Sequence, residues 1–120
     1  MTMRIPTVAG VLSESQVRES AESIVATQMQ SGAIPWFRHG HTDPWDHVQA
    51  AMALSASGRL REAEHAYGWL RSMQREDGSW AIRYREDVVE DPHTDSNFCA
   101  YIATGVWHHW RCTWDRKSVV

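Results

Sequence analysis

Four segments of the 120-residue chain have the apolar periodicity of a helix, and charged residues are plentiful in only two of them. The segment at 13–32 carries Glu14, Arg18, Glu19 and Glu22, and the segment at 59–75 carries six charged residues. The segments at 44–58 and 94–110 carry only Asp46 and Asp95, each in the first turn. A helix without charge beyond its first turn is typical of a helix surrounded by protein. The order predicts outer, inner, outer and inner helices, paired as two αα-hairpins.

The starts of these helices carry recognisable signals. Ser13, with Gln16 three residues later, has capping-box spacing. Asp43 followed by Pro44 is an N-cap before a proline at the first helical position. Strands have little room, apart from one short extended piece at 80–84. The fold class is therefore predicted to be all-α.

Composition excludes several classes of function. The net charge is −3, with 12 Lys+Arg against 15 Asp+Glu, so we expect no nucleic-acid partner. The 7 Trp supply apolar mass where Leu, Ile, Val and Phe are scarce. No apolar run is long enough for a membrane span, and no export signal precedes the first helix. We expect a cytoplasmic protein whose two cysteines are reduced.

The two hairpins share sequence features. Gln28 and Gln74 are each followed by a glycine four residues later and then by a tryptophan. The triplets His41-Thr42-Asp43 and His93-Thr94-Asp95 directly precede the two inner helices. This pattern predicts a repeat of about 50 residues. The expected domains are an N-terminal segment at 1–12, two hairpin repeats at 13–57 and 59–110, and a tail at 111–120.

One stretch resembles a known family. Trp69-Leu70-x3-Gln74-x3-Gly78-x-Trp80 looks like the QW motif of squalene and hopene cyclases, which share the α/α-toroid superfamily with protein prenyltransferases. The resemblance implies tandem αα-hairpins that form part of a barrel, with a polyprenyl or terpenoid substrate in an aromatic cavity. The catalytic motifs of that superfamily are absent, so no catalytic residue is carried over. Whether the chain is an enzyme of the prenyltransferase or terpene cyclase type stays open.

The loops that lead into the inner helices would meet at one end of such a toroid. Asp46 is the candidate catalytic acid or base, because the helix cap does not already use it. Asp43 and Asp95 also fit a purely structural role as N-caps, and Trp36 and Trp80 fit turn-sealing positions in the core. The candidate substrate-binding residues are Trp36, His41, Asp43, Trp45, Trp80, Tyr84, His93, Asp95 and Asn97.

Two other functions compete with the prenyl one. A six-hairpin glycosidase-like, carbohydrate-active domain would need two carboxylates across a sugar, for example Asp46 and Glu90. A non-catalytic binding or remnant domain would need neither. The expected ligand is therefore an isoprenoid or a glycan. We expect no cofactor and no metal, because the histidines do not form a complete set of zinc ligands.

Two hairpins of a toroid leave the sides of the inner helices uncovered. Apolar patches of that kind are typical of interfaces, so we expect a homo-oligomer. The aromatic residues that we expect in the contact are Trp45, Phe98, Tyr101 and Trp107.

Overall fold

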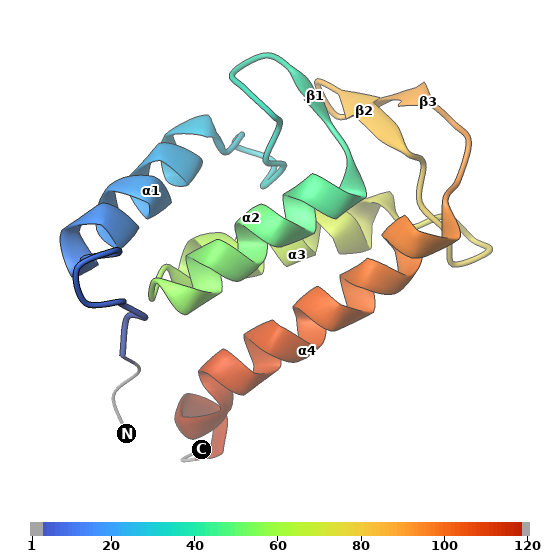
Figure 1. The fold of residues 1–120 in the computed structure, drawn as a ribbon. Coiled ribbons are helices and arrows are strands. Elements are labelled where there is room, and N and C mark those ends of the chain that lie inside the picture. Colours follow the sequence, from blue (N-terminus) through green and yellow to red (C-terminus); the bar gives the residue numbers. More distant parts are fainter. Residues whose placement is uncertain (1–3, 119–120) are drawn as a thin grey trace.

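The computed structural model describes residues 4–118, with side chains up to Trp114. It contains four helices and a small three-stranded antiparallel sheet (Figure 1). The helices are α1 (Glu14–Thr27), α2 (Pro44–Ala56), α3 (Leu60–Met73) and α4 (Ser96–Ser118). The strands are β1 (His41–Thr42), β2 (Arg83–Arg85) and β3 (Val88–Asp91), in the order β1-β2-β3.

The prediction of an all-α fold made of tandem toroid-type hairpins is therefore wrong. β1 pairs with β2 through Thr42 and Tyr84, and β2 continues through a hairpin into β3. The sheet lies at the end of the molecule where α2 begins (Figure 1). The extended piece expected at 80–84 overlaps only the first two residues of β2.

The β2–β3 hairpin turn lacks the residues by which a sequence usually predicts a hairpin. Its two central residues, Glu86 and Asp87, have positive φ angles of 48° and 63°. Two-residue hairpin turns often have positive φ angles at both central residues, but those residues are usually glycine or asparagine. Here the Asp87 carboxylate holds the turn, because Oδ1 accepts from Trp69 Nε1 and from Ser31 Oγ, both at 2.9 Å.

The predicted starts of α1 and α2 are confirmed. Ser13 caps α1, and the Gln16 side chain completes the capping box. Asp43 caps α2, with Pro44 as the first helical residue. α4 differs from the prediction, because it continues through 111–118, most of the expected tail. Residues 119–120 of that tail lie outside the described part of the chain.

α2 contacts the three other helices, and its Val48, Ala51 and Leu54 are fully buried. α4 was expected to be equally enclosed, and it is not. Ala103 is exposed, as are Val106 and Trp107, whose exposed fractions are 50% and 58%. A lack of charge on α4 therefore does not mean burial, and the predicted alternation of outer and inner helices is wrong.

The two Gln–Gly turns have matching hydrogen bonds. Gln28 Nε2 donates to the Gly32 carbonyl at 3.1 Å, and Gln74 Nε2 donates to the Gly78 carbonyl at 3.0 Å. Both glycines have positive φ angles, 101° and 88°, which side chains rarely allow. Trp80 is buried, and its Nε1 donates to the Leu70 carbonyl near the end of α3 at 2.7 Å. These turns end α1 and α3 without building a toroid around them.

His47 joins three parts of the core. It is fully buried, and its Nδ1 accepts from the Ile34 backbone N–H at 3.1 Å. Since that nitrogen is the acceptor, the proton lies on Nε2, which donates to the Ala66 carbonyl at 2.9 Å. The neutral ring therefore ties the loop before β1 to α2 and α3. Burial lowers the pKa of His47 from 6.5 to about 4.

We expect the free energy of unfolding to fall as the pH drops from about 6.5 to about 4. The pKa of His47 is lower in the folded chain than in the unfolded chain, so unfolded His47 takes up a proton first. The loss should reach about 3 kcal/mol at the acid end. Urea unfolding across this range would measure it, with His47→Gln as the comparison. A parent curve no steeper than that of the variant would contradict the assignment.

We also expect Asp87→Gly to destabilise the fold by about 2 kcal/mol or more, because it removes two hydrogen bonds and leaves the Trp69 indole unpaired. Glu86→Gly is the matched control. It also places glycine at a turn residue with positive φ, but it keeps the two hydrogen bonds of Asp87. Thermal or urea unfolding would compare the two. Equal stabilities would show that the Asp87 side chain does not hold the turn.

Candidate functional site

A groove of about 530 Å³ lies between the first turn of α2 and the N-terminal half of α4. We call it the α2–α4 groove. Ligand sites of this size, roughly 300–1,000 Å³, are common in proteins. Six of the candidate site residues line it: Trp36, Asp43, Trp45, Asp46, Asp95 and Asn97. The other lining residues come from α4: Phe98, Ala100, Tyr101 and Thr104.

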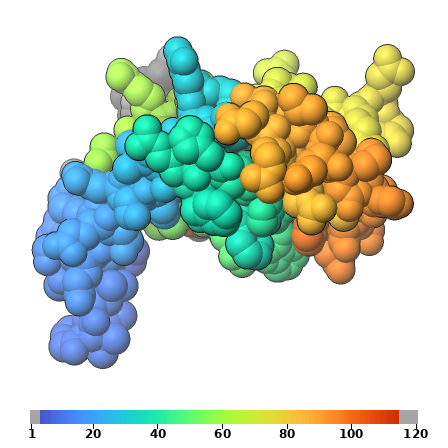
Figure 2. All heavy atoms as spheres, turned by 90° about the horizontal axis from the view of Figure 1, so that it is seen from above, coloured from blue at the N-terminus to red at the C-terminus, as the bar shows by residue number. Residues whose placement is uncertain are grey.

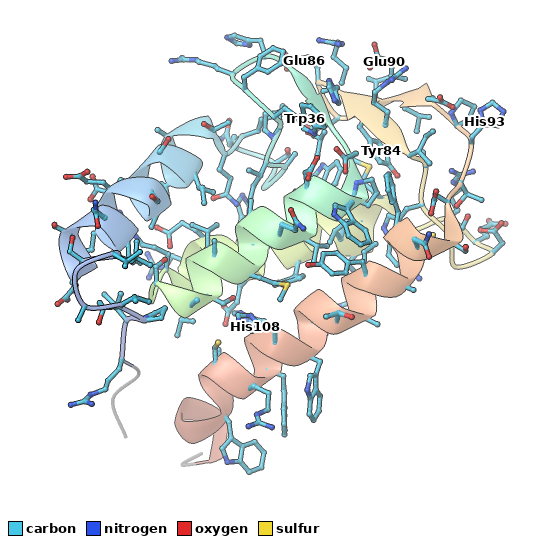
Figure 3. The ribbon with its side chains drawn as sticks, viewed as in Figure 1. Trp36, Tyr84, Glu86, Glu90, His93 and His108 are labelled. Atoms are coloured by element: carbon cyan, nitrogen blue, oxygen red, sulfur yellow. The ribbon has the colours of Figure 1, made fainter. Side chains whose placement is uncertain are left out.

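The capping aspartate of α2 is fixed on both of its oxygens. Asp43 Oδ1 accepts from the Asp46 backbone N–H at 2.9 Å, and Oδ2 accepts from Trp36 Nε1 at 2.6 Å. Trp36 lies over the start of α2 and remains 59% exposed (Figure 3). Trp36 is therefore an exposed ring held in one orientation, and not the turn-sealing core residue that the sequence also allowed.

Asp46 is the carboxyl group whose acidity the groove changes. Its pKa is raised above the ordinary 3.8, first by partial burial and then by the neighbouring negative charge of Asp43. The Trp36 and His41 side chains lower it, but by less. A carboxyl group with a raised pKa keeps its proton to a higher pH, which is the property that a general acid needs.

Aromatic rings from both helices also line the groove. Trp45 stacks on Tyr101, with ring centroids 4.1 Å apart and planes within 17°. Phe98 lies one turn earlier on α4, 6.1 Å from the Trp45 ring. Such faces pack against the C–H faces of sugar rings as well as against hydrocarbon. The sequence assigned Phe98 and Tyr101 to a subunit contact, although their spacing of three residues on one helix placed them together.

Asp95 directly precedes α4, the helix that also carries Phe98 and Tyr101. Its Oδ1 accepts from the backbone N–H groups of Asn97 at 2.8 Å and Phe98 at 3.3 Å. The carboxylate is thus held at the N-terminus of the helix, and it lines the same groove as Asp46. The groove therefore collects carboxylates from two different helices.

Four of the candidate binding residues lie outside this groove. The His41 ring lies beside that of Trp36, with centroids 4.7 Å apart and planes tilted by 40°. Trp80 and Tyr84 are buried in the core, where the Tyr84 hydroxyl accepts from the Ala81 backbone N–H at 3.0 Å. His93 is largely exposed and contacts Asp91 at 2.7 Å (Figure 3).

Glu90, the carboxylate suggested as a partner for Asp46, also lies elsewhere. It sits on β3, where its two oxygens pair with Arg83 and Arg85, each at 3.2 Å. It does not line the groove. If Asp46 works with a second carboxylate, that partner has to come from the groove itself.

A second groove of about 510 Å³ lies between α1 and α2. We call it the α1–α2 groove. It is lined by Ser23, Ile24, Thr27, Ile34, Pro35, Trp36, Asp46 and Ala50. Trp36 and Asp46 therefore line both grooves. Figure 2 shows the segment around 36–46, in cyan to teal, between α1 in blue and the β2–β3 hairpin in orange.

A series of polar side chains also connects α2, α3 and α4. Ser55 Oγ lies 2.8 Å from His109 Nδ1, and the Glu64 carboxylate lies 3.6 Å from His109 Nε2. The order of groups resembles that of a hydrolase triad, but Ser55 has no exposed surface and no substrate can reach it. The series therefore serves to hold α4 against α2.

Among the side chains that the structure describes, up to Trp114, no group of three His, Cys, Asp or Glu is arranged to hold a metal ion. The same part of the chain has no helix that is long and apolar enough to span a membrane. The cytoplasmic location stays a prediction, as do the domain boundaries.

The homo-oligomer also stays a prediction. Of the four aromatic residues expected in the contact, Trp45, Phe98 and Tyr101 are half-buried along the α2–α4 groove. Trp107 is exposed and stacks on Trp110, 5.1 Å away.

No protein-family model matches the chain. Among curated proteins, it is similar to the MMP endo-(1,4)-3-O-methyl-alpha-D-mannosidase of Mycolicibacterium hassiacum, with 57% identity over 113 residues. The match covers 94% of this chain and 32% of the mannosidase, so the chain spans about a third of that relative's length.

This comparison corrects the family resemblance. The relative is a mannosidase, and the fold contains a sheet, so the assignment to the terpenoid cyclase and prenyltransferase superfamily is wrong. Neither the identification of a QW motif nor the isoprenoid ligand that it implied is supported. A glycan ligand, the alternative reading, is compatible with the mannosidase.

Proposed function

We propose that the α2–α4 groove binds a glycan and that Asp46 is the general acid of an endo-acting glycoside hydrolase. The substrate class is a polymer of α-linked 3-O-methyl-D-mannose, as the name of the relative states for that enzyme. The observation that carries the proposal is the raised pKa of Asp46 in a groove walled by aromatic rings. The chain matches a third of the mannosidase, so activity of these 120 residues by themselves is part of the proposal.

The carboxylates divide the work of glycoside hydrolysis between them. Asp46 donates its proton to the glycosidic oxygen as the bond to the leaving sugar breaks. Asp95 supplies the second carboxylate, either attacking the anomeric carbon or activating a water, and the separation of the two groups decides which. Asp43 accepts a hydrogen bond from the Trp36 indole and acts as a positioning residue, since its charge raises the pKa of Asp46.

The aromatic wall favours a methylated sugar. A hydroxyl group needs a hydrogen-bond partner when it leaves water, whereas an O-methyl group gains by contact with an apolar surface. The stacked Trp45 and Tyr101 rings, with Phe98 beside them, offer such a surface next to the carboxylates. Trp36 supplies a further exposed ring, which lines both grooves together with Asp46.

We expect Asp46→Asn to lower kcat/KM for α-(1→4)-linked 3-O-methyl-mannose oligosaccharides by about 100-fold or more, while binding is retained. Mass spectrometry of the products would measure cleavage, and calorimetry would measure binding. Glu76→Gln, an exposed carboxylate outside the groove, is the control and should leave both unchanged. Binding without cleavage by the parent chain would favour a non-catalytic glycan-binding domain. The absence of both would refute the proposal.

We further expect Asp43→Asn to lower the pKa of Asp46. Asparagine keeps the helix cap but removes the negative charge, so the repulsion is lost and the effect of burial remains. A carbon-detected NMR titration would follow the Asp46 carboxyl group directly. In activity, the loss on raising the pH should begin at a lower pH in the variant, because the acid gives up its proton earlier. An unchanged Asp46 titration would show that Asp43 does not tune it.

A further inference from the structure

We infer that the α1–α2 groove is the second half of one glycan-binding track, which receives the sugars on the other side of the cleaved linkage from the α2–α4 groove. The inference rests on the proposed function. It adds a binding site with a defined ligand: the stretch of polymer that extends beyond Asp46.

The two grooves meet at the candidate acid. Trp36 and Asp46 are the residues common to both linings, and the grooves have similar volumes, about 510 and 530 Å³. An endo-acting enzyme cleaves inside a polymer, so sugars have to bind on both sides of the reacting bond. A track with the acid at its middle and comparable room at each end meets that requirement. A single pocket that ended at Asp46 would suit cleavage at a chain end.

The chemistry of the α1–α2 groove suits an uncharged methylated sugar. Ile24, Ile34 and Pro35 give it apolar surface, and Ser23 and Thr27 add hydroxyl groups from α1. Asp46 is the one charged residue in the lining, and it lies at the junction. A mixed apolar and hydroxyl lining fits the C–H faces, O-methyl groups and hydroxyls of such a glycan better than it fits an ion.

The groove is also built on a fixed frame. Ile34 is buried, and its backbone N–H is held by His47, the residue after Asp46. Gln28 Nε2, at the end of α1, donates to the Glu62 carbonyl of α3 at 3.0 Å, which ties the far side of the groove to the core. The two walls are therefore held in place before any ligand binds, and pre-formed walls lower the entropy cost of binding.

The test compares short and long ligands. The probes are α-(1→4)-linked 3-O-methyl-mannose oligosaccharides of two lengths, a disaccharide and an octasaccharide, added to the full chain carrying Asp46→Asn to prevent turnover. Ser23→Trp fills the α1–α2 groove from an exposed position. Ser15→Trp places the same ring at an exposed position of α1 outside both linings, as the control.

We expect Ser23→Trp to weaken binding of the octasaccharide by about tenfold or more and to leave binding of the disaccharide unchanged. Ser15→Trp should change neither. In the chain without either tryptophan substitution, backbone NMR signals of Ile24 and Thr27 should shift with the octasaccharide and not with the disaccharide.

Equal octasaccharide affinity in the two tryptophan variants, with no shifts on α1, would overturn the inference while leaving the proposed function intact. Failure of both oligosaccharides to bind anywhere would instead refute the proposed function itself. Circular dichroism of each variant would show that the helices are retained.

Discussion

The buried imidazole of His47 is the interaction on which the arrangement of this molecule depends. It satisfies an N–H of the loop before β1 and a carbonyl of α3 while sitting on α2. Both backbone groups belong to buried residues, Ile34 and Ala66, so leaving either without a partner would cost about 1–3 kcal/mol. Ile34 lies two residues before Trp36, and His47 directly follows Asp46. The same ring therefore fixes the exposed indole and the candidate acid relative to each other.

The acidity of Asp46 results from opposing effects. The N-terminus of α2 favours a negative charge there by about 0.3–1 kcal/mol, and the Trp36 and His41 side chains act in the same direction. Burial and the charge of Asp43 outweigh them, and the pKa is raised. Two donors bind the oxygens of Asp43 and hold that carboxylate beside Asp46. The fixed position of Asp43 therefore keeps one cause of the raised Asp46 pKa in place.

Local signals in the sequence predicted the helix starts and much of the groove. Ser13 and Asp43 act as caps because their side chains bond to backbone a few residues away, and such contacts are visible in a short window of sequence. The hairpin turn at Glu86–Asp87 gave no such signal, because contacts with Trp69 and Ser31 support it from far along the chain. The exposed Trp107 shows a further limit of sequence-based prediction. A helix without charged residues is apolar, but it is not necessarily buried.

The Gln–Gly turns show why a short motif misled the assignment of the family. In both, the glutamine amide donates to the carbonyl of a glycine with positive φ just past the helix end. Such a bond stabilises the end of a helix whatever the helix packs against. The motif therefore indicates only how α1 and α3 end. It can occur in any fold whose helices end in the same way.

The path of the backbone after each of these turns is specific to this fold. After the first turn, the backbone at Ile34 binds His47, and the exposed Trp36 follows. After the second, the chain places Trp80 under α3 and forms the sheet. Both routes return to the N-terminus of a helix that begins with a capping aspartate, Asp43 or Asp95. The two caps thus face one groove, and a glycan lying in it would contact carboxylates fixed by the same bonds that begin the helices.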